Sequence, residues 1–234
     1  MSKNEKVEKI LAKSKYNFDD LCLIMEILRG EGGCPWDAEQ THESIRKNFI
    51  EETYEVIEAI DNKDSALLKE ELGDVLLQVV FHTQMENEAG NFNIDGVAHD
   101  VCAKLVHRHP HIFGDVVAST SDEVLSNWEA IKNVEKSRET MYDKLSSVPP
   151  MTPSLMRASK VAKKSGEFNE KSNSDIIINI ENLLALMKEN EENIEPKNMG
   201  EILFLLGALS SKTGIDAEES LFKKTNSFVE KYKD

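Results

Sequence analysis

The chain has 234 residues, of which 40% are hydrophobic and 30% are charged, and this composition predicts a folded protein and excludes a disordered one. Acidic residues outnumber basic ones by 43 to 28, and the resulting net charge of −15 argues against nucleic acid or an anionic membrane as a partner. Three widely spaced cysteines, no signal-peptide core and no apolar run of membrane-spanning length lead us to expect a cytoplasmic protein without disulfides.

Hydrophobic residues at helical spacing predict four helices in the first half of the chain. The first predicted helix stops at a glycine-rich loop, and a glycine at position 90 stands where a helix C-terminus is expected. Four helices with short connections are typical of a bundle. The predicted helices cover residues 18–28, 38–60, 65–89 and 94–107.

A cluster of prolines marks the predicted boundary between two parts of the chain. Thr120 and Glu123 have capping-box spacing and predict one more helix, after which Pro149, Pro150 and Pro153 interrupt the pattern. No segment shows sustained strand alternation, so we predict an all-α fold. The predicted domains are a four-helix-bundle-type domain at 1–140, a linker at 141–153 and a second helical domain at 154–234, with helices near 154–165, 175–191, 197–212 and 216–232.

The two halves share a weak internal repeat. The segment Leu-Gly-Asp-Val-Leu-Leu at residues 72–77 matches Met-Gly-Glu-Ile-Leu-Phe at residues 199–204. In both halves a glycine follows about one helix later, at Gly90 and Gly214. This pattern predicts duplication of a helical unit.

Five acidic residues form two clusters on neighbouring predicted helices. Glu51, Glu52 and Glu55 lie within one helical turn, and Glu71 and Asp74 lie within one turn of the next helix. If these two helices pack antiparallel, the clusters face each other across one gap. Oxygen ligands from two helices would then surround a hard cation such as Mg²⁺.

An isolated EExxE string usually indicates a solvated acidic helix face. Here the residue pattern of the third predicted helix favours a metal site instead. Apolar residues occupy most of its circumference and leave Glu71, Asp74, Gln78 and His82 in a stripe roughly 80° wide. Ionised groups on a mostly buried helix are unfavourable unless a cation or a base neutralises them. We therefore predict bound metal at this stripe.

Four motifs in order resemble those of the MazG-like, all-α nucleoside triphosphate pyrophosphohydrolases. The resemblance implies magnesium, or alternatively manganese, held by Glu52, Glu55, Glu71 and Asp74, and hydrolysis of nucleoside triphosphates to monophosphates and pyrophosphate. It covers residues 18–135 strongly and the rest weakly. The motifs are GCPWDAEQT at residues 33–41, EETYE at 51–55, ELGD at 71–74 and KLVHRHPHIF at 104–113.

The resemblance assigns further roles around the predicted cation. Glu51 is a further ligand or the general base, and Glu52 shares the catalytic role with it. Lys104 and Arg108 are four residues apart, so they can present adjacent positive charges to the triphosphate. Trp36 either stacks on the nucleobase or anchors the core.

The second half departs from the family pattern because its acids are largely missing. Asn198 and Glu201 stand opposite Glu71 and Asp74, and the segment opposite EETYE, in register 181–185 or 182–186, keeps at most one carboxylate. One or two acids cannot assemble a magnesium–triphosphate site. We therefore assign catalysis to the first half and a structural or dimerising role to the second, in a homodimer or higher homo-oligomer.

Three alternatives stay open at this point. The protein could be a non-catalytic helical nucleotide sensor or scaffold that kept its acids for binding. A di-iron bundle needs two ExxH pairs, and only residues 39–42 have that spacing. A phosphohydrolase could be built around His99 and Asp100 together with His82.

Overall fold

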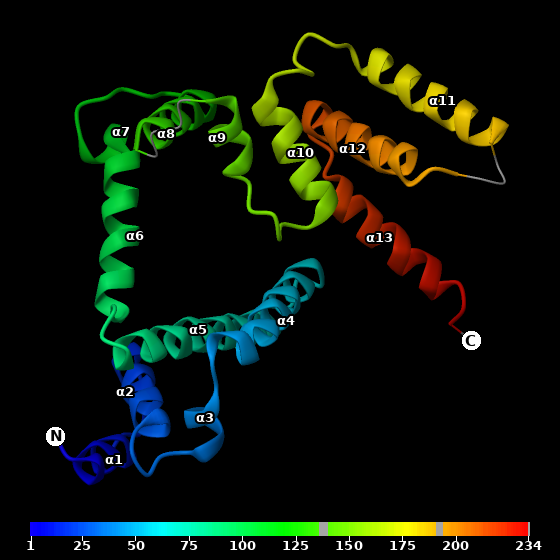
Figure 1. Ribbon diagram of the computed structural model, residues 1–234. Helices are drawn as coiled ribbons and strands as arrows, with labels where there is room; N and C mark the ends of the chain where they lie inside the picture. The colour runs from blue at the N-terminus through cyan, green and yellow to red at the C-terminus, as the bar shows by residue number, and fades with distance from the viewer. Residues whose placement is uncertain (136–139, 191–193, 234) are drawn as a thin grey trace. The chain divides into compact units, whose positions relative to one another are not determined.

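The computed structural model describes residues 1–135, 140–190 and 194–233, and all regular elements in these ranges are helices (Figure 1). The predicted all-α class is therefore confirmed. The chain divides into two compact units, Met1–Leu125 and Ser126–Asp234. The domain boundaries at 140 and 153 stay a prediction. Within the described ranges, every helix is too short or too polar to cross a membrane.

The first unit is built around two long antiparallel helices, α4 and α5, which lie side by side (Figure 1). Asp64 accepts hydrogen bonds from the backbone N–H groups of Ala66 and Leu67, so it caps α5 directly after the reversal. The helices of this unit are α1 (Lys3–Leu11), α2 (Phe18–Arg29), α3 (Pro35–Glu39), α4 (His42–Asp61), α5 (Ser65–Glu88), α6 (Ile94–Arg108) and α7 (Pro110–Phe113), and α8 (Ser121–Glu135) begins in it.

The structure corrects the prediction of one continuous helix over residues 38–60. The chain breaks at Gln40 and Thr41, and Thr41 starts α4 with a capping box to Ser44. The sequence analysis also missed α1, although Ser2 and Glu5 form a capping box there. The predicted helices at 65–89 and 94–107 are confirmed to within one residue at either end.

The core of the first unit lies between α2, α4 and α5. Met25 of α2 and Ile45 of α4 pack with the α5 residues Val80, Phe81 and Met85, all of them buried. Burying such side chains contributes about 1.5–3 kcal/mol each. This core fixes the hairpin of α4 and α5 at the end opposite its turn.

The second unit is held by close packing of α10 on α12. A Cβ added at Gly207 would lie 2.6 Å from the Cβ of Ala158, so only glycine allows this approach. Its core contains Ala162, Phe168, Ile176, Leu205 and Ala208. The helices are the rest of α8, then α9 (Met141–Ser146), α10 (Ser154–Ser165), α11 (Asn173–Glu189), α12 (Pro196–Thr213) and α13 (Ala217–Glu230).

The first turn of α10 is capped from a distant part of the chain. Its own N-cap residue, Pro153, provides no side-chain hydrogen bond. Instead, the Glu218 carboxylate of α13 accepts hydrogen bonds from the backbone N–H groups of Leu155 at 3.1 Å and Met156 at 3.4 Å. A negative charge at this position also interacts favourably with the dipole of α10.

Candidate active site

The α4–α5 hairpin brings three of the predicted acids together. One carboxylate oxygen from each of Glu52, Glu55 and Glu71 lies within 4.8 Å of the other two. Asp74, one turn beyond Glu71, is close enough for its charge to act on both Glu52 and Glu71. Glu51 is exposed and lies outside this converging group.

Burial and mutual repulsion perturb two of these carboxyl groups. Burial raises the pKa of Glu71, and the charges of Glu55, Glu70 and Asp74 raise it further. Burial also raises the pKa of Glu52. A hydrogen bond with Glu55 and the negative charges of Asp74 and Glu71 raise it further. Glu71 is only 9% exposed, so its ionised form is unfavourable in the isolated protein. A cation held between the acids would remove this cost.

The donor set fits a hard divalent cation. All three converging ligand atoms are carboxylate oxygens, with no sulfur or imidazole nitrogen in the group. Such sites suit Mg²⁺ or Mn²⁺, and Mg²⁺ usually keeps room for water and phosphate oxygens. The exposure of Glu55 leaves that side of the group accessible.

The polar stripe of α5 continues away from the acids to a histidine pair. His42 and His82 stack with ring centroids 5.0 Å apart, and their Nδ1 atoms are 2.7 Å apart. The other ring nitrogen of His42 lies 2.8 Å from Oε1 of Glu86. Burial lowers the pKa of His82, and the neighbouring His42 lowers it further. Between this pair and Asp74 on α5 lies Gln78, whose buried Oε1 has no hydrogen-bond partner among the described residues.

The sequence predicted the α5 stripe with His82 and the acids of α4 that face it, but it did not predict that His42 pairs with His82 and Glu86. His42 entered only as part of an ExxH string. The signal that could have found Glu86 is its position one turn after His82 on the same face. The rival site built on His82, His99 and Asp100 is not assembled in the described part of the chain, because His82 faces α4 while His99 and Asp100 are exposed on α6.

Trp36 lies outside the described core. It is the second residue of α3, and its side chain is 58% exposed. Gln40 donates a hydrogen bond to the backbone carbonyl of Trp36 at 2.9 Å, so the backbone is held while the indole ring faces outward. Of the two predicted roles, a core anchor does not fit this position.

Lys104 and Arg108 lie near the C-terminal end of α6. Lys104 is exposed and Arg108 is buried. In Figure 1, α6 starts at the C-terminal end of α5 and leads away from the hairpin, whereas Glu71 and Asp74 lie in the N-terminal half of α5. A single protomer therefore does not bring this basic pair to the acids.

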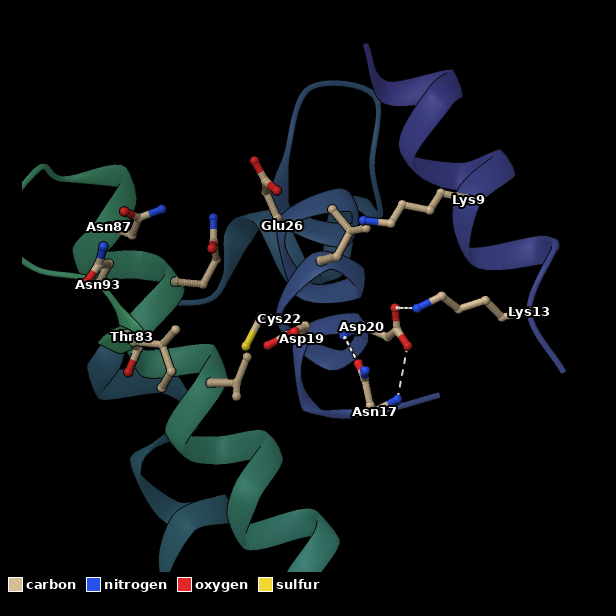
Figure 2. Close-up of a pocket in the computed structure, with 14 residues that line it drawn as sticks. Lys9, Lys13, Asn17, Asp19, Asp20, Cys22, Glu26, Thr83, Asn87 and Asn93 are labelled. Carbon is tan, nitrogen blue, oxygen red and sulfur yellow. Dashed lines mark hydrogen bonds and ion pairs between the residues drawn. The ribbon is translucent and has the colours of Figure 1, made fainter. Parts of the chain in front are cut away.

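A separate cavity of about 420 Å³ lies between α1, α2, α5 and the start of α6 (Figure 2). It is on the other side of α5 from the acids, because its α5 residues, including Thr83 and Asn87, are offset from the acidic stripe on the helical wheel. The buried Asp20 carboxylate binds Lys13 at 2.5 Å and the backbone N–H of Asn17 at 3.0 Å. The bond to Lys13 ties the segment after α1 to α2, and the bond to Asn17 belongs to the capping box at the start of α2.

Comparison with known proteins decides the family. Residues 40–113, which contain both acidic clusters, match the MazG nucleotide pyrophosphohydrolase domain. The chain is 40% identical over 219 residues to the nucleoside triphosphate pyrophosphohydrolase/pyrophosphatase MazG of Thermotoga maritima, covering 92% of this chain and 84% of that protein. The chain belongs to the MazG nucleotide pyrophosphohydrolase family.

Other MazG-family relatives extend the match. A nucleoside triphosphate pyrophosphohydrolase of Escherichia coli K12 is 36% identical over 225 residues, covering 92% of this chain and 86% of that protein. A protein of the same name from Mycolicibacterium smegmatis is 40% identical over 144 residues, covering 61% of this chain and 44% of that protein. Membership of the MazG family assigns the chain to the hydrolases that act on acid anhydrides.

Proposed function

We propose that this protein hydrolyses nucleoside triphosphates to nucleoside monophosphates and pyrophosphate, with Mg²⁺ or Mn²⁺ held in its N-terminal half. The observation that carries the proposal is the convergence of Glu52, Glu55 and Glu71 in the α4–α5 hairpin. The Thermotoga maritima and Escherichia coli relatives are both named nucleoside triphosphate pyrophosphohydrolases, which supports the same reaction.

The chemistry follows from the positions of the acids. Glu52, Glu55, Glu71 and Asp74 would hold the cation, which when bound neutralises phosphate charge and polarises the phosphoryl oxygens. Water attacks the α-phosphorus, the bond from that phosphorus to the bridging oxygen breaks, and pyrophosphate leaves. Glu51, the exposed neighbour of Glu52 in the sequence, would take the proton from the water or act as a further ligand.

We assign the reaction to the first unit because the second retains too few acids. Asn198 and Glu201 take the places of Glu71 and Asp74. Among the described residues, the one group of three or more possible metal ligands is Glu52, Glu55 and Glu71. The second unit then serves structure or dimerisation.

We propose that the active form is a homodimer or higher homo-oligomer. Leu72 of α5 is 51% exposed although the sequence pattern predicted a mostly buried helix, and Leu76 is also exposed. Exposed apolar residues continue along α4 and α6: Ile50, Tyr54, Ile57, Val101, Leu105 and Val106. A second copy covering these faces would bury them and provides a route for its Lys104 and Arg108 to reach the triphosphate.

We place the protein in the cytoplasm, where free thiols such as those of Cys22, Cys34 and Cys102 stay reduced. The substrate is the small nucleotide itself, and the acidic net charge disfavours nucleic acid and membrane surfaces as partners.

The deciding experiment is a panel of nucleoside triphosphates incubated with and without Mg²⁺, with all products identified. We expect monophosphate and pyrophosphate only when the cation is present. Glu55→Gln should abolish turnover, whereas Glu58→Gln, a substitution one turn away at an exposed position outside the converging group, should not. Nucleotide binding without turnover would support the sensor alternative, and diphosphate plus orthophosphate would indicate a different reaction.

A further inference from the structure

Arg29 at the end of α2 contacts both α5 and α3 of the first unit. Its side chain is 8% exposed. Nε and Nη2 donate to the Glu88 carboxylate of α5 at 3.0 and 2.9 Å, and the guanidinium lies 5.3 Å from the Phe81 ring centroid. Nη1 donates to the backbone carbonyls of Asp37 at 2.6 Å and Gln40 at 3.2 Å.

The two carbonyls belong to the C-terminal end of α3, the short helix that carries Trp36. Gln40 is the C-cap residue of α3, and its side chain donates back to the carbonyl of Trp36. The chain enters α3 through a tight loop in which a Cβ at Gly33 would lie 2.2 Å from the carbonyl oxygen of Leu28. The backbone of α3 is therefore fixed at both ends, while the indole of Trp36 stays exposed.

We propose that Arg29 is a positioning residue for nucleotide binding, acting through α3 to hold the backbone of Trp36 where its exposed indole can stack on the nucleobase. This inference rests on the proposed function. A backbone that is held before binding loses less conformational entropy when a base stacks on its indole, so the bonds from Arg29 raise affinity without a contact between Arg29 and the substrate.

The bonding pattern separates this role from simple anchoring. The pair with Glu88 alone would hold α2 on α5. The two bonds to Asp37 and Gln40 serve only α3, and they require the planar fork of arginine, since a lysine ammonium cannot bind a carboxylate in bidentate fashion and reach both carbonyls. Arg29→Lys therefore keeps the charge beside Glu88 and loses the hold on α3.

The test compares Arg29→Lys with Trp36→Ala and with the double variant. For ATP with Mg²⁺, we expect Arg29→Lys to raise KM about tenfold while kcat changes little, because about 1.4 kcal/mol of binding corresponds to a factor of ten. Trp36→Ala should raise KM similarly. In the Trp36→Ala background, Arg29→Lys should add nothing, as expected for two residues acting as one unit.

A spectroscopic measurement checks the same point without turnover. In a Trp128→Phe background, Trp36 is the remaining tryptophan, and Arg29→Lys should lower its fluorescence anisotropy. Lys6→Gln is the matched control, because it breaks another part-buried ion pair of the first unit, to Glu26, without contacting α3. It should leave both KM and anisotropy unchanged.

The outcomes separate this inference from the proposed function. Absence of pyrophosphate release by the wild-type protein refutes the proposed function, and the dissociation constant of an α,β-imido ATP analogue together with the anisotropy then decides the role of Arg29. If Arg29→Lys leaves KM unchanged, lowers kcat alone, or weakens binding equally with and without Trp36, Arg29 does not act through Trp36 and the inference is overturned.

Discussion

The effect of Glu71→Gln on the stability of the protein should change sign when a divalent cation is added. Without a cation, the variant should unfold at a higher temperature than the wild type, because it removes a buried charge whose pKa is raised by burial and by neighbouring carboxylates. With Mg²⁺ or Mn²⁺ present, the wild type should unfold at the higher temperature, because its Glu71 carboxylate is a ligand for the cation that the variant lacks.

The size of the effect follows from binding linkage. At a cation concentration of 100 times Kd, the wild type gains about 2.7 kcal/mol. For a chain of this length, that gain corresponds to a rise in Tm of about 5–10 °C. A tenfold loss of affinity in Glu71→Gln reduces the stabilisation to about 1.4 kcal/mol.

Differential scanning fluorimetry over a cation titration measures both parts of this prediction. Glu58→Gln is the control and should follow the wild type. The pH dependence gives a second check. Because the folded-state pKa values of Glu52 and Glu71 are raised, the stability that these groups contribute below about pH 4.5 is lost as the pH rises through the raised values. A cation-free Glu71→Gln variant less stable than the wild type at pH 7.5 would refute the reasoning.

The remaining predictions concern the histidine pair and the proposed dimer. Burial and His42 lower the pKa of His82 from 6.5, so the stability that His82 contributes above that pH is lost as the pH falls. Thermal melts from pH 8 to 5 should therefore show a smaller loss of stability for His82→Gln than for the wild type. Equal losses would contradict this prediction. Gly73→Ala should stabilise the fold by about 0.5–1 kcal/mol, because an added Cβ meets nothing within 4 Å in the single chain. The same substitution should weaken self-association measured by sedimentation. Unchanged association would argue against a partner packed across this glycine. Leu76→Lys should leave Tm at low protein concentration nearly unchanged and shift the protein to monomer, whereas a variant that stays dimeric would place the interface elsewhere.

The helices and the acidic hairpin could be predicted because their causes are local. The ranges of α5 and α6 were predicted to within one residue, because their caps and apolar periodicity are local. The range of α10 was predicted to the residue, because it begins directly after Pro153 and ends directly before Gly166. The meeting of Glu52 with Glu71 needed only one further assumption, that adjacent helices joined by a short turn pack antiparallel.

Features that depend on long-range contacts could not be predicted in the same way. The bonds from Arg29 to Glu88 join residues far apart in the sequence, and nothing near either residue indicates its partner. The exposure of Leu72 is also invisible in the sequence pattern, because hydrophobic spacing shows which faces avoid water but does not show whether this chain or a second copy covers them. The structure shows that Glu52, Glu55 and Glu71 converge, whereas the roles of all the predicted site residues stay predictions.

The cap that Glu218 provides to α10 has a consequence for how the protein is made. At about 5–20 residues per second, the ribosome adds Glu218 about 3–13 s after Leu155, so the first turn of α10 stays without this cap during that time. The acids of the α4–α5 hairpin are separated by much shorter stretches of chain and can meet while synthesis is still in progress. We expect the first unit to be protease-resistant on stalled ribosomes before the second unit has finished folding.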